Sequence, residues 1–104
     1  MSDRVDALRS LLAADPENHF IRYGLAMEYA KSGQLDTAMS EFRALIEANP
    51  DYAAAYFQAG QTLERAGDVE GARQMYETGI EVTTRRGDSH TRDELRAALD
   101  LLPL

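Results

Sequence analysis

Apolar residues recur along the chain at the spacing of an α-helix, in segments that are separated by polar residues. One stripe runs through residues 35–46 and consists of Leu35, Ala38, Met39, Phe42, Leu45 and Ile46. Shorter stripes lie near the two ends, namely Val5, Leu8, Leu11 and Leu12, and Leu95, Ala98, Leu99 and Leu102. A single apolar stripe predicts a helix buried along one side, so these residues are expected to point inward.

The segment from Phe20 to Tyr29 differs because it is apolar on two sides. One stripe consists of Leu25, Ala26 and Tyr29, and the other of Phe20, Tyr23 and Met27. A helix of this kind either packs against two neighbours or packs once and offers its second side to a ligand. The pattern alone leaves both interpretations open.

Capping residues predict where the helices begin and end. Asp15-Pro16-Glu17 and Asn49-Pro50-Asp51 each provide a capping side chain, a proline suited to the first helical position and an acid for the helix dipole. Thr91-Arg92-Asp93-Glu94 has the capping-box pattern. A basic residue shortly before or next to a glycine predicts helix ends at Lys31-Ser32-Gly33, Arg65-Ala66-Gly67 and Arg85-Arg86-Gly87.

Residues also repeat at an offset of 34. Pairs at this offset are Pro16 and Pro50, Gly33 and Gly67, Ala38 and Ala72, Ile46 and Ile80, and Glu47 and Glu81. This period is typical of a helix-turn-helix solenoid, so we predict an all-α fold of about six antiparallel helices in one domain, residues 1–104. The predicted parts are a flanking helix (1–15), a first repeat (16–49), a second repeat (50–84) and a C-terminal capping helix (85–104).

Charge and composition argue against several classes of function. The net charge is -7, whereas nucleic acid or an anionic membrane surface requires a basic face on the protein. The sequence shows neither a membrane-spanning apolar run nor a signal-peptide pattern, and cysteine, with its disulfide and thiolate chemistry, is absent. We expect a cytoplasmic protein. Arginine stands at every basic position except Lys31, which is typical of a GC-rich bacterial source.

No residue pattern points to catalysis. His19 and His90 lack a second His or Cys at metal-ligand spacing, and no glycine-rich phosphate loop is present. We therefore predict no catalytic residue, no metal and no cofactor, and a protein that is not an enzyme.

The repeated residues resemble the tetratricopeptide repeat family, whose pattern sets large, small and aromatic residues and a proline at fixed spacing. In the first repeat the pattern is matched by Leu25, Ala26, Tyr29, Ala38, Phe42 and Pro50. In the second repeat it is matched by Tyr56, Gly60, Ala72 and Tyr76. Arg22 departs from the pattern, because the family usually has Trp at this position.

The resemblance implies a concave groove that binds a peptide or protein segment and is lined by the first helix of each pair. Carried onto this chain, the groove residues are Phe20, Tyr23, Met27, Lys31, Ala54, Phe57, Gln58, Gln61 and Arg65. The alternatives are that the aromatic residues pack in the core and that Lys31 and Arg65 serve only the helix dipoles. Members that hold acidic chaperone tails carry charge where this chain has Tyr23, Met27 and Gln58, which implies no useful affinity for such tails.

The predicted function is therefore a non-catalytic protein–protein interaction module whose partner is an unknown protein or peptide. The alternative is a structural protein that associates with itself. Leu101 and Leu104 are left over from the apolar stripe of the last helix, and spare apolar surface of this kind suits a dimer contact. We expect a monomer or a weak homodimer.

Overall fold

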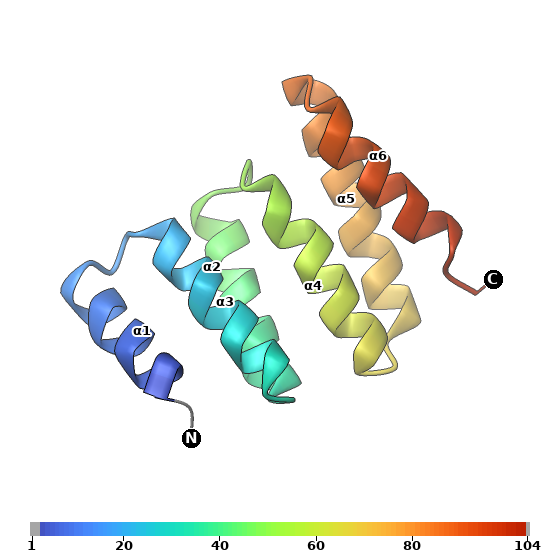
Figure 1. The fold of residues 1–104 in the computed structure, drawn as a ribbon. Coiled ribbons are helices and arrows are strands. Elements are labelled where there is room, and N and C mark those ends of the chain that lie inside the picture. Colours follow the sequence, from blue (N-terminus) through green and yellow to red (C-terminus); the bar gives the residue numbers. More distant parts are fainter. Residues whose placement is uncertain (1–2, 104) are drawn as a thin grey trace.

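The chain folds into six α-helices, shown in a computed structural model that describes residues 3–103 (Figure 1). The helices are α1 (Asp3–Ala14), α2 (His19–Lys31), α3 (Leu35–Ala48), α4 (Ala53–Arg65), α5 (Val69–Arg86) and α6 (Ser89–Asp100). No strand is found within the described residues, so the predicted all-α fold is confirmed. Leu104, one of the two leucines that we considered for a dimer contact, lies outside the described part.

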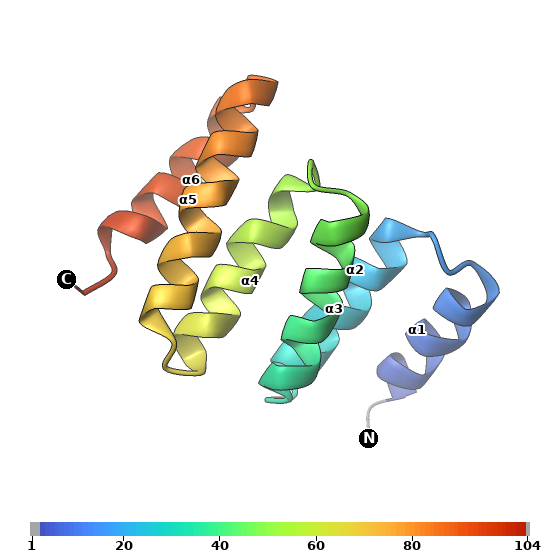
Figure 2. The same cartoon turned by 180° about the vertical axis from the view of Figure 1, so that it is seen from behind.

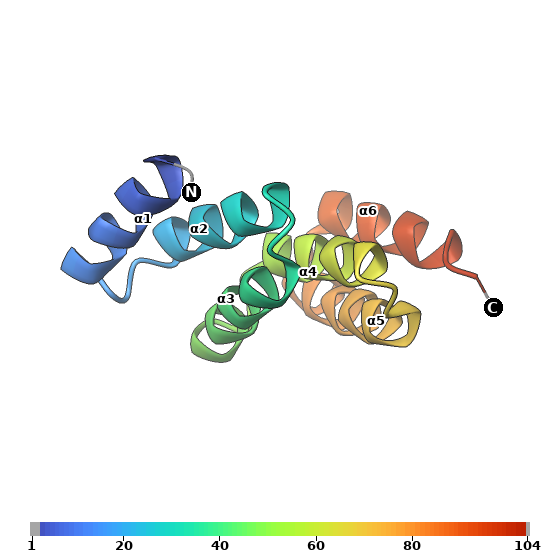
Figure 3. The same ribbon diagram turned by 90° about the horizontal axis from the view of Figure 1, so that it is seen from below.

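The helices form two layers that curve into a shallow arc. Each helix packs against the next along the chain, and α2 also touches α4, which in turn touches α6. Seen from below, α2, α4 and α6 form one layer, and α1 and α6 rise on either side of α4 (Figure 3). The second layer, α3 and α5, is nearest the viewer from behind (Figure 2). The layer of α2, α4 and α6 is therefore the hollow side of the arc.

Glycines end three of the helices, as the sequence predicts. Gly33, Gly67 and Gly87 have φ angles of 82°, 83° and 74°, in the left-handed region where a Cβ atom is unfavourable. They follow Lys31, Arg65 and Arg86, the last residues of α2, α4 and α5. The tight turns allow the next helix to begin at once and to run antiparallel.

The predicted helix starts at the two prolines are wrong by three residues. The helix α2 begins at His19, and its N-cap is Asn18, whose side chain accepts a hydrogen bond from the Ile21 amide at 3.0 Å. Pro16 lies in a turn that is closed by the Asn18 amide donating to the Asp15 carbonyl. The second repeat has the same turn around Pro50, and α4 begins at Ala53. The fixed φ of proline fits the second position of such a turn as well as the first position of a helix.

The predicted capping box at Thr91 is also wrong, because α6 begins one turn earlier. Its N-cap is Asp88, whose carboxylate accepts a hydrogen bond from the Thr91 amide at 3.1 Å. This hydrogen bond from the Thr91 backbone is the main cause that holds the pKa of Asp88 below its usual value, and a hydrogen bond from the Thr91 side chain is the second cause.

The Asp88 cap makes a testable contribution to stability that depends on pH. Its depressed pKa means that the contribution is present above the unfolded pKa and is lost as pH falls through the folded value. We expect Asp88→Ala to lower the melting temperature at pH 7, and the difference from the wild type to shrink toward pH 3. Asp88→Asn is the matched control, because asparagine caps a helix without titrating. A difference between wild type and Asp88→Ala that is constant with pH would contradict this assignment.

The core lies between the two layers, where the repeat places its small and aromatic residues. Phe42 and Tyr76, which are 34 residues apart, are both completely buried, as are Ala38 and Ala72. The Tyr76 ring crosses α4 at Gly60, where a Cβ atom would lie 2.1 Å from the tyrosine Cε1. Close approach of α4 and α5 thus depends on a residue without a side chain at this position.

The helix α1 buries a narrower face than its apolar stripe predicts. Val5 is buried and Leu8 and Leu12 are partly buried, but Leu11 is 54% exposed, so the prediction that it points inward is wrong. The physical reason is that the α1 backbone approaches only that of α2 within the described residues. One partner helix covers one side, and Leu11 lies outside it.

Candidate binding surface

Contacts with α3 and α1 assign two sides of α2. Toward α3, the Arg22 guanidinium lies 2.6 Å from the Glu41 carboxylate. Toward α1, Glu28 accepts from Arg4 at 2.7 Å, and a Cβ atom at Gly24 would touch only Leu8. The remaining side faces the hollow of the arc, and helical spacing places Phe20, Met27 and Lys31 on it.

The helix α4 repeats this arrangement 34 residues later. Ala55, Ala59 and Thr62 are buried on one side, and Tyr56, Gly60 and Leu63 on another. The positions left for the hollow side are Ala54, Gln58, Gln61 and Arg65, which are spaced as one helical stripe. The counterparts of Phe20, Met27 and Lys31 are therefore Ala54, Gln61 and Arg65, so the surface is more apolar at α2 than at α4.

Phe20 is the most exposed large apolar side chain of this surface. It is 76% exposed at the first turn of α2, which excludes the alternative that it packs in the core. A phenylalanine in this state leaves most of its apolar area in water, at a cost of about 25 cal/mol per Å² relative to burial. Burial by another molecule would recover that free energy.

Tyr23 and Phe57 lie partly in the core. The Tyr23 ring is 5.4 Å from that of Tyr52 and 6.3 Å from that of Phe42, between centroids. Burial is the main cause that raises the pKa of Tyr23; nearby Tyr52 raises it further and a hydrogen bond with Gln58 opposes the shift. The Phe57 ring lies 6.3 Å from that of Tyr76. Both residues therefore support the surface from beneath and expose only part of each ring.

A polar network fixes the middle of the surface on α4. Gln61 Nε2 donates to the Tyr76 hydroxyl at 2.6 Å, and that hydroxyl donates to the Glu64 carboxylate. The pKa of Tyr76 is strongly raised, first by burial and then by the bond to Glu64, so the phenol is neutral at physiological pH. Gln61 is held by a residue of α5 and presents a fixed amide on the hollow side.

Lys31 and Arg65 have different surroundings although they occupy equivalent positions. The Arg65 guanidinium donates to the Ala30 carbonyl at 2.8 Å, which stabilises the C-terminal end of α2. Lys31 is exposed. Arg65 is thus a cation that stabilises the C-terminal end of a helix, as the dipole interpretation expects. The helix concerned is α2, however, and not α4, to which Arg65 belongs.

The sequence pattern missed Leu11 as a surface residue. Leu11 lies seven residues after Arg4, on the same face of α1, and Arg4 pairs with Glu28 of α2. The opposite flank of α1, with Arg9 and Ala13, faces α3. Leu11 therefore lies on the flank of α1 that borders the hollow side. A count of helix partners, in addition to the apolar period, could have identified it.

Two further observations bear on chemistry. Within residues 3–103, no group of three or more His, Cys, Asp and Glu side chains is arranged to hold a metal ion. None of the helices in this part of the chain is long and apolar enough to cross a membrane.

The stacked, antiparallel helix pairs with a hollow first-helix layer define a helical-repeat protein of the solenoid class. Residues 23–81 match the family model of the tetratricopeptide repeat, so the chain belongs to the tetratricopeptide repeat family. The resemblance that the spacing of Leu25, Tyr29, Phe42 and Pro50 suggests is thereby confirmed.

Relatives of known sequence or structure agree with this assignment. A TPR repeat-containing protein of Pseudomonas aeruginosa is 30% identical over 95 residues, 91% of this chain and 90% of that protein. A solved structure of a Bordetella parapertussis protein is 34% identical, with a TM-score of 0.83 over 96% of this chain and 87% of the other. YrrB, described as a TPR protein with an unusual peptide-binding site, is 25% identical, with a TM-score of 0.78 over 89% of this chain and 46% of YrrB.

Proposed function

We propose that this chain is a non-catalytic module that binds a segment of another polypeptide on its hollow side. The observation that carries the proposal is the exposed Phe20 on the stripe that also holds Met27 and Lys31. Leu11, 54% exposed, lies on the adjoining flank of α1 and extends this apolar area. Exposed aromatic and aliphatic groups beside fixed polar groups are typical of interfaces with peptides.

The polar part of the surface supports a role in orientation. Gln61, whose amide NH2 group donates to Tyr76 and Glu64, offers its carbonyl oxygen as an acceptor for a peptide N–H group. Lys31 and Arg65 are both exposed and place positive charge at the C-terminal end of the two helices. The proposed partner segment therefore puts a bulky apolar side chain against Phe20 and polar groups against the opposite end. YrrB, a similar protein described as having an unusual peptide-binding site, makes a polypeptide the first class of ligand to test.

Phe20→Ser tests the proposal without disturbing the core. Because the side chain is 76% exposed, we expect the free energy of unfolding to change by about 0.5 kcal/mol or less. Capture of the partner by immobilised protein from a lysate of the source cells should fall by at least about tenfold, as for an aromatic anchor residue. The measurement is quantitative mass spectrometry of the captured proteins.

Leu101→Ser is the matched control for this experiment. Leu101 is also an exposed large apolar residue, at 85%, but it follows α6 at the far end of the chain. Its replacement should leave capture unchanged. If Phe20→Ser retains every protein that the wild type captures, the hollow side does not bind the partner.

Self-association is the second candidate, and the 85% exposure of Leu101 favours it. We expect a monomer or a dimer with a dissociation constant above about 10 µM, because one exposed leucine contributes little against the cost of association. Analytical ultracentrifugation over a wide concentration range measures this directly. A dimer of nanomolar affinity that Leu101→Ser abolishes would favour the structural alternative over a monomeric binding module.

A further inference from the structure

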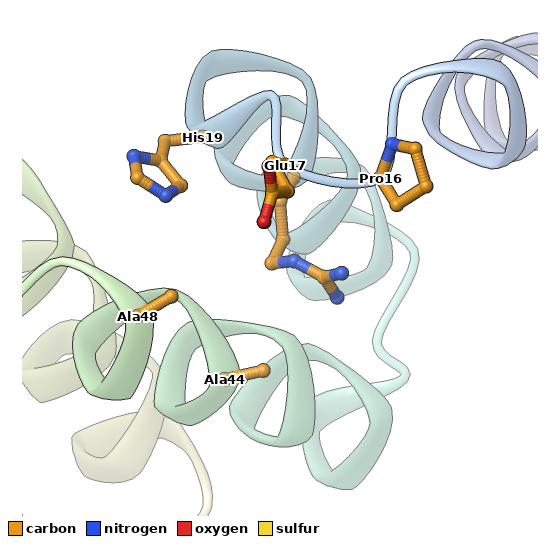
Figure 4. A pocket seen from close by; sticks show the side chains of 6 residues that line it. Pro16, Glu17, His19, Ala44 and Ala48 are labelled. Atoms are coloured by element: carbon orange, nitrogen blue, oxygen red, sulfur yellow. The ribbon is translucent and has the colours of Figure 1, made fainter.

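A surface hollow lies between the start of α2 and the end of α3, away from the surface proposed above. It has a volume of about 480 Å³ and is lined by Pro16, Glu17, His19, Arg22, Ala44 and Ala48 (Figure 4). This volume falls in the range of ~300–1,000 Å³ that is typical of ligand sites. None of the nine predicted groove residues lines it.

The second repeat shows what fills the corresponding place. The counterpart of Arg22, 34 residues later, is Tyr56, which is only 2% exposed. Its hydroxyl donates to the Pro50 carbonyl at 2.6 Å, and Pro50 is the counterpart of Pro16. In the second repeat, a phenol ring therefore occupies the space beside the proline turn.

The first repeat lacks this ring because Arg22 turns away toward α3. Its guanidinium lies 2.6 Å from the Glu41 carboxylate. In the second repeat Gly79 lies beneath Tyr56. Its counterpart in the first repeat is Leu45, which is fully buried and fills the deep part of the corresponding space. The outer part stays open and accessible from solvent.

The side chains that line the hollow on α3 are also smaller than their counterparts on α5, and α3 is shorter than α5. Ala44 and Ala48 take the positions of Thr78 and Val82. The helix α3 ends at Ala48, whereas α5 continues to Arg86.

The end of α5 closes the corresponding place in the second repeat. Arg85 and Arg86 pair with Asp51 at 3.2 Å and 3.1 Å. Glu17, the counterpart of Asp51, is exposed and lines the hollow together with Ala44 and Ala48 (Figure 4).

We propose that this hollow is a second binding site, which takes a tyrosine side chain of a partner polypeptide. The ring would lie on Ala44 and Ala48 beside the Arg22 guanidinium, where a cation and an aromatic face attract each other. Its hydroxyl would donate to the Glu17 carboxylate, in the manner of a buried tyrosine that needs one polar partner. The partner supplies the phenol that this repeat lacks and the second repeat contains.

The surroundings favour a polypeptide rather than a free aromatic molecule. A neighbouring hollow of about 460 Å³ shares Pro16 and Arg22 and continues along α1 past Arg9, Leu12 and Ala13. Together the two hollows give a path between α1 and α3, whose backbones do not approach each other in the described part of the chain. The residues that flank the tyrosine would lie along this path.

The test uses N-acetyl-tyrosinamide as the probe and N-acetyl-phenylalaninamide as its matched analogue. In ¹⁵N-resolved NMR titrations we expect saturable shifts at the amides of Glu17, His19, Ala44 and Ala48, with a dissociation constant on the order of 1 mM for so small a ligand. The analogue without the hydroxyl should bind about fivefold to tenfold more weakly, because Glu17 is left without a donor.

Two variants and one competing ligand decide the outcome. Ala44→Leu places a larger side chain in the wall of the hollow at a partly exposed position and should weaken binding at least about tenfold. Arg22→Tyr places a ring in the hollow, so it should abolish the shifts and raise the melting temperature. The proposal would be overturned if no shift saturates or if the shifts centre on Phe20. It would also be overturned if both variants bind the probe as strongly as the wild type does. Stronger binding of methylguanidinium than of the tyrosine probe would assign the hollow to a basic ligand and would overturn it too.

Discussion

Leu25→Asn is expected to unfold most of the protein at 37 °C. Leu25 is 2% exposed in the centre of α2. Its replacement removes buried apolar area, at a cost of ~2–5 kcal/mol, and buries an amide without a partner, at a cost of ~1–3 kcal/mol. The sum is comparable to the whole stability of a small domain, which is about 5–15 kcal/mol. Thermal and urea unfolding followed by circular dichroism at 222 nm measure it.

Leu25→Met is the conservative control, because it keeps the volume and the apolar character of the side chain. It should cost less than about 1.5 kcal/mol. If Leu25→Asn changes the urea midpoint no more than Leu25→Met does, the assignment of this face of α2 to the core is wrong.

Gly60→Ala is expected to lower the stability by about 2 kcal/mol, although alanine is the better helix former. The added Cβ atom would lie 2.1 Å from Cε1 of Tyr76, which is completely buried. The tyrosine cannot simply move aside, since its hydroxyl is bonded to Gln61 and Glu64. Overpacking of this kind costs ~1–3 kcal/mol or more, and the helix propensity of alanine offsets only about 1 kcal/mol.

Gly24→Ala provides the opposite result at a glycine in the middle of α2. There a Cβ atom would meet only methyl groups of Leu8, at 3.8 Å and 4.0 Å. We expect Gly24→Ala to stabilise the protein by up to about 1 kcal/mol. Adding Tyr76→Leu to Gly60→Ala should recover part of the loss, because the two changes relieve the same overlap. Equal effects of the two alanine variants would contradict the packing at Gly60.

The repeat period predicted the fold because each repeated residue is required either by the local backbone conformation or by packing that recurs in both repeats. Glycine at residues 33 and 67 is required by a left-handed turn, and the small and aromatic residues of α3 and α5 meet the same neighbours in each repeat. The helix starts at Pro16 and Pro50 could not be placed from such cues. An acid or amide before proline fits a helix start and a turn equally well, and only the hydrogen bonds of Asn18 and Tyr52 distinguish them.

The candidate surface was less predictable, because exposure depends on partners that the period does not specify. Leu11 falls in an apolar stripe but is exposed, since α1 has a single neighbouring helix. Tyr23 shares a helix face with Met27, yet the ring of Tyr52, which comes from the turn before α4, partly covers it. The hollow beside Pro16 depends on the direction of one side chain, Arg22, and no sequence pattern predicts that direction.

Photo-cross-linking from the hollow side can show whether another polypeptide binds there. A benzophenone amino acid replaces Phe20, which it resembles in shape, or Glu81, an exposed residue of α5 in the second layer. Both variants are expressed in the source cells, irradiated and analysed by gel shift and mass spectrometry. We expect a specific covalent adduct with another polypeptide from position 20 and none from position 81. Adducts from position 81 alone, or none from position 20 while the protein still captures its partner, would contradict this expectation.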